Sequence, residues 1–337
     1  MKVNSHHYNL EMQHPFGISR SVHRFQETFI VELEQDGVKG YGEATQNRYY
    51  GSSLQNMQEG LDALKNDIEK YPFSTPEDFW DNFLYPRLNN FRFLMAAIDE
   101  AANDLYGKLL GKPLYELWGY DLKNIPLSTY TIALDKIDVM KEKLLEKPWP
   151  VYKIKLGTEH DIEIVKALRE ITNKPFRVDA NTAWTAQQTI ENSRILKDLG
   201  VEFIEQPLPY NHYDEMKYVR KHSALPIIAD ESSRTEEDVL KCYESFDGIN
   251  VKLVKAGGIT PGKRMLEEAR KLGMKTMIGC MTESSVGISA AAQLLPLCDY
   301  ADLDGAILLK NDIAQGVGLK NGQFIFPHKP GTGVELL

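Results

Sequence analysis

The sequence predicts an α/β protein in which a barrel of parallel strands and helices follows a smaller α+β domain. Three observations predict this class. The chain has 337 residues, of which 42% are hydrophobic, enough for a large core in one or two domains. About the first 120 residues read as alternating strands and then helices. From about residue 125, short apolar segments alternate with helix-like stretches.

The N-terminal region predicts a short antiparallel sheet and a helix. Three segments alternate in character, at residues 2–12, 24–35 and 38–45. Asp36-Gly37 between the last two predicts a hairpin turn. Apolar residues then recur every three or four positions over 94–109, which predicts a helix that ends near Gly111. We expect an α+β domain over residues 1–122.

Eight apolar segments in the second region have the length of buried parallel strands. They are STYTIAL, VYKIKLG, PFRVDAN, EFIEQPL, PIIADES, GINVKLV, KTMIGCM and DYADLDG. Successive landmark residues lie 22 to 28 positions apart, the length of a strand with its returning helix: Lys155, Asp179, Glu205, Asp230, Lys252, Cys280 and Asp302. Eight units predict a closed (β/α) barrel over residues 123–319. The alternative, an open doubly wound sheet, usually has a GxGxxG turn, which this sequence lacks. A C-terminal tail, about residues 320–337, can return to the first domain.

Composition and charge exclude several classes of function. The net charge is −9 and there is no basic stripe, so nucleic acid is not an expected partner. No apolar run approaches the roughly 20 residues that span a bilayer, and the N-terminus lacks an apolar signal core. The three cysteines have no CxxC spacing, which favours a reducing compartment. We expect a cytoplasmic protein without membrane contact, and a homo-oligomer is compatible with the sequence.

Three carboxylates predict a metal site. Asp179, Glu205 and Asp230 lie near the ends of three adjacent strands, at the face where barrel enzymes assemble their sites. There they would repel one another unless a cation lay among them. Oxygen ligands of this kind favour Mg²⁺. The alternative is that each acid caps the helix after its strand, but three in consecutive units favour the metal.

Strand lysines predict acid–base chemistry. Lys153 and Lys155 share a face of the second predicted strand, and Lys252 lies on the sixth, so Lys155 and Lys252 oppose each other in a ring of eight. A desolvated lysine near a cation has a lowered pKa, which lets its neutral amine act as a base. Lys255 has the opposite parity to Lys252 and is expected in a loop, as a solvated charge.

These motifs resemble a known family. The order KxK, Asp, Glu, Asp and then INVK followed by AGG resembles the enolase superfamily, in particular its muconate-lactonising subgroup. RVDANTAW, FIEQPL and IIADES resemble its three metal-ligand strands, and AIDEAANDLYGKLLGKPLYELWG resembles its helical segment before the barrel. The resemblance covers nearly the whole chain. It implies a modified (β/α)7β TIM-like barrel under an N-terminal α+β capping domain.

The resemblance also implies a chemistry, in which a proton alpha to a carboxylate is removed and Mg²⁺ stabilises the enediolate. The implied roles are metal ligands for Asp179, Glu205 and Asp230, the acid/base pair for Lys155 and Lys252, and a positive charge beside the enediolate oxygen for Lys153.

The eighth predicted strand suggests the reaction. Asp302 and Asp304 form a DxD pair across from the metal, so the far end of a metal-bound carboxylate substrate should carry a positive charge, such as an α-ammonium. The pair resembles that of dipeptide epimerases, including the alanyl-glutamate epimerases. We therefore expect a Mg²⁺-dependent isomerase that inverts the alpha carbon of the C-terminal residue of an L,L or L,D dipeptide. The alternative for the pair is a helix cap or a solvated loop end.

Specificity is expected to come from capping-domain loops over Phe16–Arg24 and Gln46–Ser53. The candidates are Arg20 and Arg24 for an acidic side chain, Tyr49 and Tyr50 for an apolar pocket or for domain packing, and Met281 and Glu283 after the seventh strand. Other functions stay open at this point. They are an o-succinylbenzoate synthase or muconate-type cycloisomerase on the same scaffold, a Schiff-base aldolase, and a non-catalytic barrel that binds amino-acid-like ligands.

Overall fold

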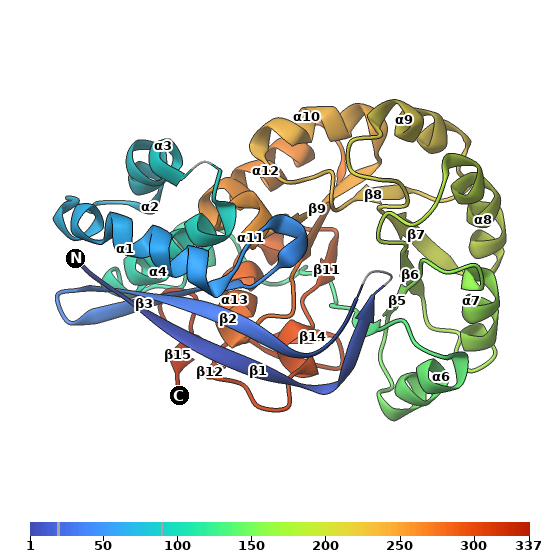
Figure 1. Cartoon of the computed structure of the whole chain (residues 1–337), viewed down its shortest axis with the longest axis horizontal. Coiled ribbons are helices and arrows are strands. Elements are labelled where there is room, and N and C mark those ends of the chain that lie inside the picture. The colour runs from blue at the N-terminus through green and yellow to red at the C-terminus, as the bar shows by residue number, and fades with distance from the viewer. Residues whose placement is uncertain (19–20, 89) are drawn as a thin grey trace.

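A computed structural model describes residues 1–18, 21–88 and 90–337 of the chain, so the candidate Arg20 lies outside the described residues. An eight-stranded parallel barrel lies beside a domain built on a three-stranded antiparallel sheet (Figure 1). Both parts of the predicted fold class are confirmed. No helix within these ranges is long and apolar enough to cross a membrane.

The N-terminal sheet has the order β1-β2-β3, with β1 at Lys2–Ile18, β2 at Ser21–Gln35 and β3 at Val38–Thr45. The predicted hairpin turn is confirmed, since Asp36 and Gly37 have positive φ angles of 54° and 79°. The helical elements that follow are η1 (Arg48–Tyr50), α1 (Leu54–Lys70), α2 (Pro76–Phe79), the π-helical turn η2 (Trp80–Leu84), α3 (Tyr85–Leu88), α4 (Arg92–Leu109) and α5 (Leu114–Leu117).

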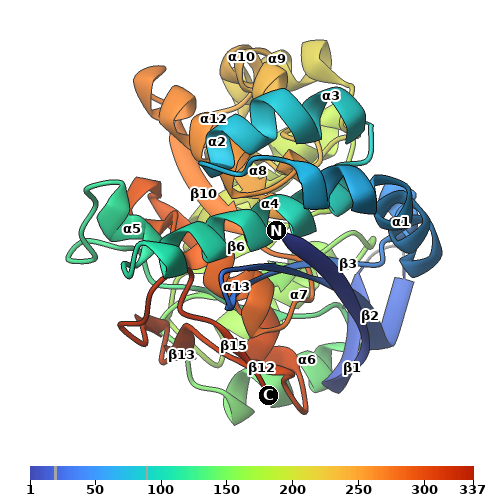
Figure 2. The same ribbon diagram turned by 90° about the vertical axis from the view of Figure 1, so that its left-hand side faces the viewer.

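Helix α4 lies directly on the sheet because β3 presents glycines to it. A Cβ atom on Gly40 would lie 2.3 Å from the carbonyl oxygen of Ala101, and one on Gly42 would lie 2.1 Å from that of Ala97. Small residues on both elements therefore allow the close approach. Figure 2 shows α4 running between the N-terminal elements and the barrel, which explains why it is buried on nearly all sides.

All eight predicted barrel strands are confirmed. They are β4 (Tyr130–Ile132), β5 (Tyr152–Lys155), β6 (Phe176–Asp179), β7 (Val201–Glu205), β8 (Ile227–Ala229), β9 (Gly248–Lys252), β10 (Lys275–Gly279) and β11 (Tyr300–Asp302). They pair in sequence order, and a parallel bridge between Ser128 and Ala301 brings the first strand next to the last. The ring is therefore nearly closed.

Seven of the connections carry a longer helix, as a (β/α)7β barrel requires. These helices are α6 (Ile137–Glu146), α7 (Asp161–Arg169), α8 (Ala186–Asp198), α9 (Tyr213–His222), α10 (Glu236–Ser245), α12 (Ile259–Lys271) and α13 (Ser285–Ala292). Shorter turns are α11 (Leu253–Ala256), η3 (Leu295–Leu297) and η4 (Gly305–Leu308). The last turn, η4, follows β11 where an eighth helix would stand.

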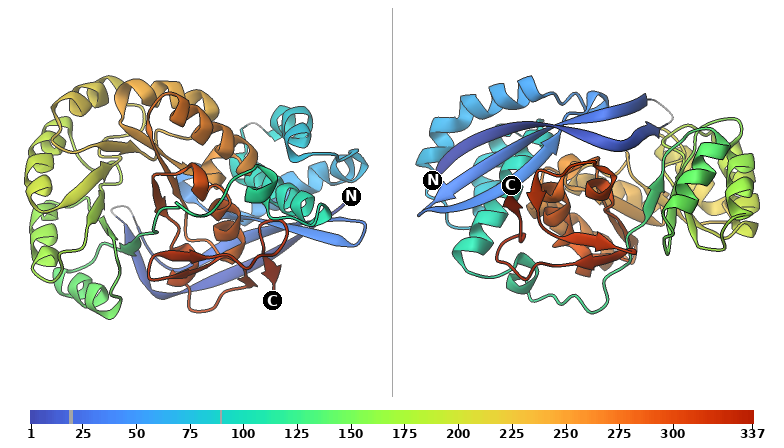
Figure 3. Two further views of the ribbon diagram at one scale, coloured as in Figure 1. Left: turned by 180° about the vertical axis from the view of Figure 1, so that it is seen from behind. Right: turned by 90° about the horizontal axis from the view of Figure 1, so that it is seen from below.

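The chain ends in short strands: β12 (Ala314–Gln315), β13 (Gly318–Lys320), β14 (Gln323–Ile325) and β15 (Glu335–Leu336). Figure 3 shows this segment, in dark red, close to the N-terminal sheet. Thr332 donates hydrogen bonds to Asp104 of α4 from both its amide and its hydroxyl, and Lys108 donates to the carbonyl oxygen of Val334. The end of the tail thus contacts α4, while the domain limits at about residues 122 and 319 stay predictions.

Candidate active site

The strand register places the predicted metal ligands at the same end of the barrel. Asp179 and Glu205 are the last residues of β6 and β7, and they are direct partners in the parallel pairing. Lys155, the last residue of β5, is the partner of Asp179. Asp230 follows β8 by one position. Because side chains alternate along a strand, equivalent terminal positions direct these groups to the same end of the barrel.

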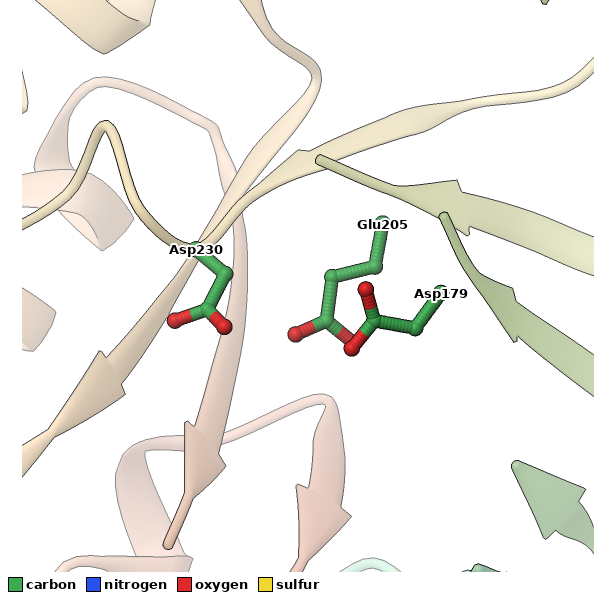
Figure 4. Close-up of side chains that lie close together, drawn as sticks. All are labelled: Asp179, Glu205 and Asp230. Carbon is green, nitrogen blue, oxygen red and sulfur yellow. The ribbon is translucent and has the colours of Figure 1, made fainter. Parts of the chain in front are cut away.

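Asp179, Glu205 and Asp230 converge there. All three are buried, and each offers a carboxylate oxygen within 4.8 Å of the other two (Figure 4). Burial and the charge of Asp179 raise the pKa of Glu205 to about 7. The three side chains offer only oxygen atoms, which hard divalent cations prefer. Such a cation would also relieve the repulsion between the carboxylates that keeps Glu205 from ionising.

Lys153 and Lys155 already contact these acids. The Nζ atom of Lys153 lies 3.1 Å from Asp179, 2.8 Å from Glu205 and 2.7 Å from Asp302. The Nζ atom of Lys155 lies 2.7 Å from Asp179 Oδ2. Burial works to lower the pKa of Lys153, but the surrounding carboxylates raise it well above its usual value. Lys153 is therefore a fixed positive charge at the centre of the cluster.

Lys252 and Lys255 both hold Asp230. Lys252 Nζ lies 2.9 Å from Asp230 Oδ2, and Lys255 Nζ lies 2.5 Å from Oδ1. The expectation that Lys255 is a solvated loop charge was wrong. It lies in the short helix α11, its Nζ atom also donates to the carbonyl oxygens of Asp230 and Asn250, and it is only 2% exposed. Burial favours the neutral acid, but the charges of Lys252, Lys255 and Lys153 together lower the pKa of Asp230.

Lys155 and Lys252 end strands on opposite walls. Between β5 and β9 lie β6, β7 and β8 on one side and β10, β11 and β4 on the other. Asp179, Glu205 and Asp230 lie at the ends of β6, β7 and β8, on the first of these two sides. Without a cation, burial acts to lower the pKa of Lys252, but the charges of Asp230, Glu205 and Asp179 together raise it above its usual value. A cation bound at Asp230 would act against this increase.

Asp302 and Asp304 add two further carboxyl groups to the site, at the end of β11. Both are buried. Asp302 accepts hydrogen bonds from Lys153 and, at 2.5 Å, from the Thr129 hydroxyl, while Asp304 Oδ2 accepts one from the amide of Thr131 at 2.6 Å. Burial and the charge of Asp302 raise the pKa of Asp304 to about 7. The predicted anionic pair is thus one paired carboxylate and one carboxyl that ionises reluctantly.

Comparison with known proteins places the chain in a family. Residues 137–337 match the model of enolase C-terminal domain-like proteins, and residues 2–119 match that of the mandelate racemase / muconate lactonizing enzyme N-terminal domain. The chain belongs to the enolase superfamily. It is 53% identical, over all of both chains, to a Flavobacterium johnsoniae protein named L-Ala-D/L-amino acid epimerase. It is 37% identical to an L-Ala-D/L-Glu epimerase of Bacteroides thetaiotaomicron, over 99% of this chain and 88% of that one.

Among solved structures of the enolase superfamily, a dipeptide epimerase from Enterococcus faecalis V583 is similar along nearly its full length. The TM-score is 0.92, the identity 30%, and the likeness covers 99% of this chain and 98% of that one. That protein was crystallised with Mg and the dipeptide L-Leu-L-Tyr. The fold and its capping domain are therefore those of the superfamily.

The predicted specificity residues of this superfamily member differ in their exposure to solvent and in their contacts. Arg24 is exposed on β2, and Tyr50 ends η1 in a half-buried position. Glu283 is buried, accepts a hydrogen bond from the amide of Met281 at 2.8 Å, and has its pKa raised to about 8 by burial and by the charge of Glu43. Their roles at a substrate stay predictions.

Two residues that support the acids were missed from the sequence. Asn250 donates from Nδ2 to Glu205 at 2.9 Å, and Gln206 Oε1 accepts from the amides of Asp230 and Ser232. Asn250 has the same parity as Lys252 on β9, so alternation along the strand was a usable signal for it. Gln206 has a positive φ of 33°, a local conformation that no sequence pattern indicates.

Proposed function

We propose that this protein is a Mg²⁺-dependent dipeptide epimerase that inverts the alpha carbon of a dipeptide's C-terminal residue. The observation that carries the proposal is the arrangement of the buried triad Asp179, Glu205 and Asp230 between two lysines on opposed strands. Relatives named as epimerases, and the solved dipeptide epimerase crystallised with Mg and a dipeptide, support it.

Asp179, Glu205 and Asp230 would hold the Mg²⁺ ion. When bound, the ion would supply positive charge beside the substrate's carboxylate and so acidify the adjacent C–H bond. Lys153 adds a second positive charge from the barrel axis, in contact with Asp179 and Glu205. Its charge would stabilise the negative charge that develops on the carboxylate as the α-proton leaves.

Lys155 and Lys252 would move the proton. With the α carbon between them, the neutral amine of one lysine takes the α-proton from one face. The ammonium group of the other lysine then donates a proton to the opposite face, so that the configuration inverts. Each turnover leaves the first lysine protonated and the second neutral. Both must then exchange protons with the solvent before the same diastereomer can react again.

Asp302 and Asp304 would bind the substrate's ammonium group. Asp302 shares its charge with Lys153, and Asp304 Oδ2 accepts a hydrogen bond from the amide of Thr131. An ammonium nearby would favour ionisation of Asp304 and form a charge-assisted hydrogen bond with it. A substrate with a free amine one peptide unit from the reacting carbon meets this requirement.

Isotope exchange tests the proposal directly. The protein is incubated in D₂O with Mg²⁺ and a set of L-Ala-L-Xaa dipeptides, and deuterium at the C-terminal α carbon is followed by NMR and mass spectrometry. We expect exchange together with formation of the L,D product, and loss of both after treatment with EDTA. Turnover of an o-succinylbenzoate precursor, with no exchange in any dipeptide, would instead favour the cycloisomerase-type alternative.

A further inference from the structure

Three glutamates form a second buried acidic cluster, where the N-terminal domain meets the barrel. Glu43 lies on β3 and Glu100 on α4, which runs along this boundary (Figure 2), whereas Glu283 lies in the loop between β10 and α13. All three are at most 2% exposed, and the proposed mechanism uses none of them. Within residues 1–18, 21–88 and 90–337, no lysine, arginine or histidine forms an ion pair with any of the three. Their charge must therefore be balanced in another way.

Glu43 is balanced by hydrogen-bond donors. Its two oxygens accept bonds from the hydroxyl of Thr28 at 2.7 Å, from the amide and the hydroxyl of Ser284, and from the amide of Gly287 at 2.9 Å. Ser284 is the N-cap of α13 and Gly287 lies in its first turn, so the end of this helix also favours a negative charge. Burial raises the pKa of Glu43, but these bonds act in the opposite direction. Glu43 is therefore the ionised member of the cluster.

Glu100 and Glu283 lack such donors. Glu100 Oε2 accepts a bond from the amide of Glu43 at 3.0 Å, but no N–H or O–H group of the described residues donates to the buried Oε1 atom. Burial raises the pKa of Glu100 well above its usual value, and the charge of Glu283 is the next-largest cause. Burial and the charge of Glu43 raise the pKa of Glu283 to about 8. Two neighbouring carboxyls in such an interior do not both ionise at neutral pH.

The loop that carries Glu283 packs against the candidate ammonium-binding acids. Cys280 Sγ donates to the carbonyl oxygen of Asp302 at 3.3 Å. Gly305 directly follows the DxD pair, and a Cβ atom on it would lie 2.8 Å from the carbonyl oxygen of Met281 and 3.0 Å from the backbone nitrogen of Glu283. A movement of this loop would therefore be transmitted to the DxD pair.

We infer that Glu100 and Glu283 share one proton across the boundary between the two domains. The resulting hydrogen bond makes Glu283 a positioning residue for the loop that packs against the DxD pair. Loss of the proton would leave Glu43, Glu100 and Glu283 all negative, and their repulsion would displace the loop. The positioning role rests on the proposed dipeptide epimerase function and deepens it, because Asp302 and Asp304 are the proposed ammonium site. Glu283 would then act without touching the dipeptide.

Other titratable groups face this pair from the surrounding elements. They are Glu43 of β3, Asp99 of α4, Lys252 of β9 and Cys280 of the same loop. The charges of Glu43 and Asp99 act to keep the proton on Glu100, whereas the charge of Lys252 favours ionisation of Glu283. Lys252 itself pairs with Asp230, so it does not replace the proton between the two glutamates.

Infrared spectroscopy in D₂O tests the shared proton without any substrate, because a protonated carboxyl and a carboxylate have separate stretching bands. We expect Glu100→Gln to lose one protonated carboxyl relative to the wild type at neutral pH, since the introduced amide can donate to an ionised Glu283. Glu191→Gln, at an exposed position of α8, is the matched control and should lose none. An unchanged protonated-carboxyl band in Glu100→Gln would overturn the inference.

The pH dependence of KM tests the positioning role. KM and kcat for L-Ala-L-Leu are measured for the wild type, Glu100→Gln and Glu191→Gln between about pH 7 and pH 9.5, a range that includes the raised pKa of Glu283. The amine of the dipeptide also loses its charge in this range, but it does so equally for all three proteins.

We expect the ratio of the wild-type KM to the KM of Glu100→Gln to rise at least about fivefold across this range, because only the wild-type pair has a shared proton to lose. The corresponding ratio of kcat values should stay constant, since the lysines are the same in both proteins. For Glu191→Gln both ratios should stay constant. A KM ratio for Glu100→Gln that does not change with pH would contradict the positioning role.

The two measurements separate this inference from the function on which it rests. A wild type that epimerises dipeptides, with a constant KM ratio, leaves the proposed function standing and removes the positioning role. A wild type that epimerises no dipeptide removes the positioning role together with the function, while the infrared result still decides the shared proton. Should Glu100→Gln fail to fold by circular dichroism, Glu283→Gln carries both measurements, because its amide can donate to an ionised Glu100. An unchanged carboxyl band and a constant KM ratio there overturn the inference.

Discussion

Lys155 and Lys252 serve different faces of the substrate in the proposed reaction, because they end strands on opposite walls of the barrel. We expect Lys155→Ala and Lys252→Ala each to lower epimerisation by about 10³-fold, within the usual contribution of a positioned acid or base. Each variant should still exchange the α-proton of one diastereomer with D₂O, and the two variants should differ in which one. Retained exchange of the same diastereomer in both variants would contradict opposed lysines. Lys271→Ala, at an exposed position of α12, is the control.

Lys255 provides a second test at the residue scale. Its Nζ atom is buried beside Asp230 Oδ1, where a divalent cation would compete with it for the same carboxylate. We expect Lys255→Met to lower the free energy of unfolding by about 1.5–3 kcal/mol in EDTA, the usual loss for a hydrogen bond to a charged group. Saturating Mg²⁺ should reduce this loss because it restores positive charge at Asp230.

Urea unfolding with and without Mg²⁺ measures the effect of Lys255→Met. Lys271→Met, which breaks an exposed pair with Glu268, should cost less than about 1 kcal/mol in both conditions. An equal loss for Lys255→Met in EDTA and in Mg²⁺ would show that this lysine acts independently of the cation site.

Among the elements, α4 and α12 are joined through a buried acid. Asp99 of α4 accepts hydrogen bonds from the amide and the hydroxyl of Thr260, in the first turn of α12, and from Asn103. Burial raises the pKa of Asp99 to about 7, although the bonds from Thr260 act in the opposite direction. The folded protein therefore holds this proton more tightly than the unfolded chain, in which the pKa is near 3.8.

This linkage predicts a pH dependence of stability. Between about pH 4 and pH 7 the wild type should lose up to about 1.4 kcal/mol per pH unit through Asp99, because burial in the folded state resists its ionisation. Asp99→Asn removes that loss, so its stability relative to the wild type should rise through this window and level off above it. Urea unfolding at half-unit pH steps measures the difference. Asp198→Asn, at an exposed position of α8, should give a constant difference, and a constant difference for Asp99→Asn would refute the linkage.

The elements also show how far the sequence could lead. The eight strands and the convergence of Asp179, Glu205 and Asp230 were predictable, because strand periodicity and the circular order of a barrel determine both. Lys255 was not predictable, because it lies in a one-turn helix between β9 and Gly257, where φ is 105°, so the alternation of side chains along β9 does not apply to it. The contact between Lys153 and Asp302 depends on side-chain reach across the barrel, which residue spacing does not encode.

A cavity of about 420 Å³ that is lined in part by Arg234 depends on the whole molecule. Its walls come from segments near residues 50, 91, 210 and 234, which are brought together only when the N-terminal domain lies against the barrel. No local pattern in the sequence around Arg234 indicates a cavity. Docking of one domain against the other therefore determines which side chains line this cavity, and the strand order alone determines the triad.

The C-terminal tail is the last connection at this scale, and Gly331 gives a test of it. Gly331 has a φ of 70°, and a Cβ atom there would lie 2.3 Å from Asp104 Oδ1 and 2.6 Å from the Asp104 carbonyl oxygen. Gly331→Ala should therefore cost about 1–2 kcal/mol for the left-handed conformation and about 1–3 kcal/mol more for the clash with α4.

Gly111→Ala is the matched control, because Gly111 has a similar φ of 68° and nothing within 4 Å of its Cβ position. We expect it to show the conformational cost alone in urea unfolding, so the excess loss in Gly331→Ala measures how tightly the tail docks on Asp104. If the tail detaches to avoid the clash, limited proteolysis should cut Gly331→Ala near residues 326–333 faster than Gly111→Ala. Equal losses and equal cleavage rates would mean that the tail yields without affecting α4. The hydrogen bonds from Thr332 to Asp104 would then contribute little to holding the N-terminal domain against the rest of the chain.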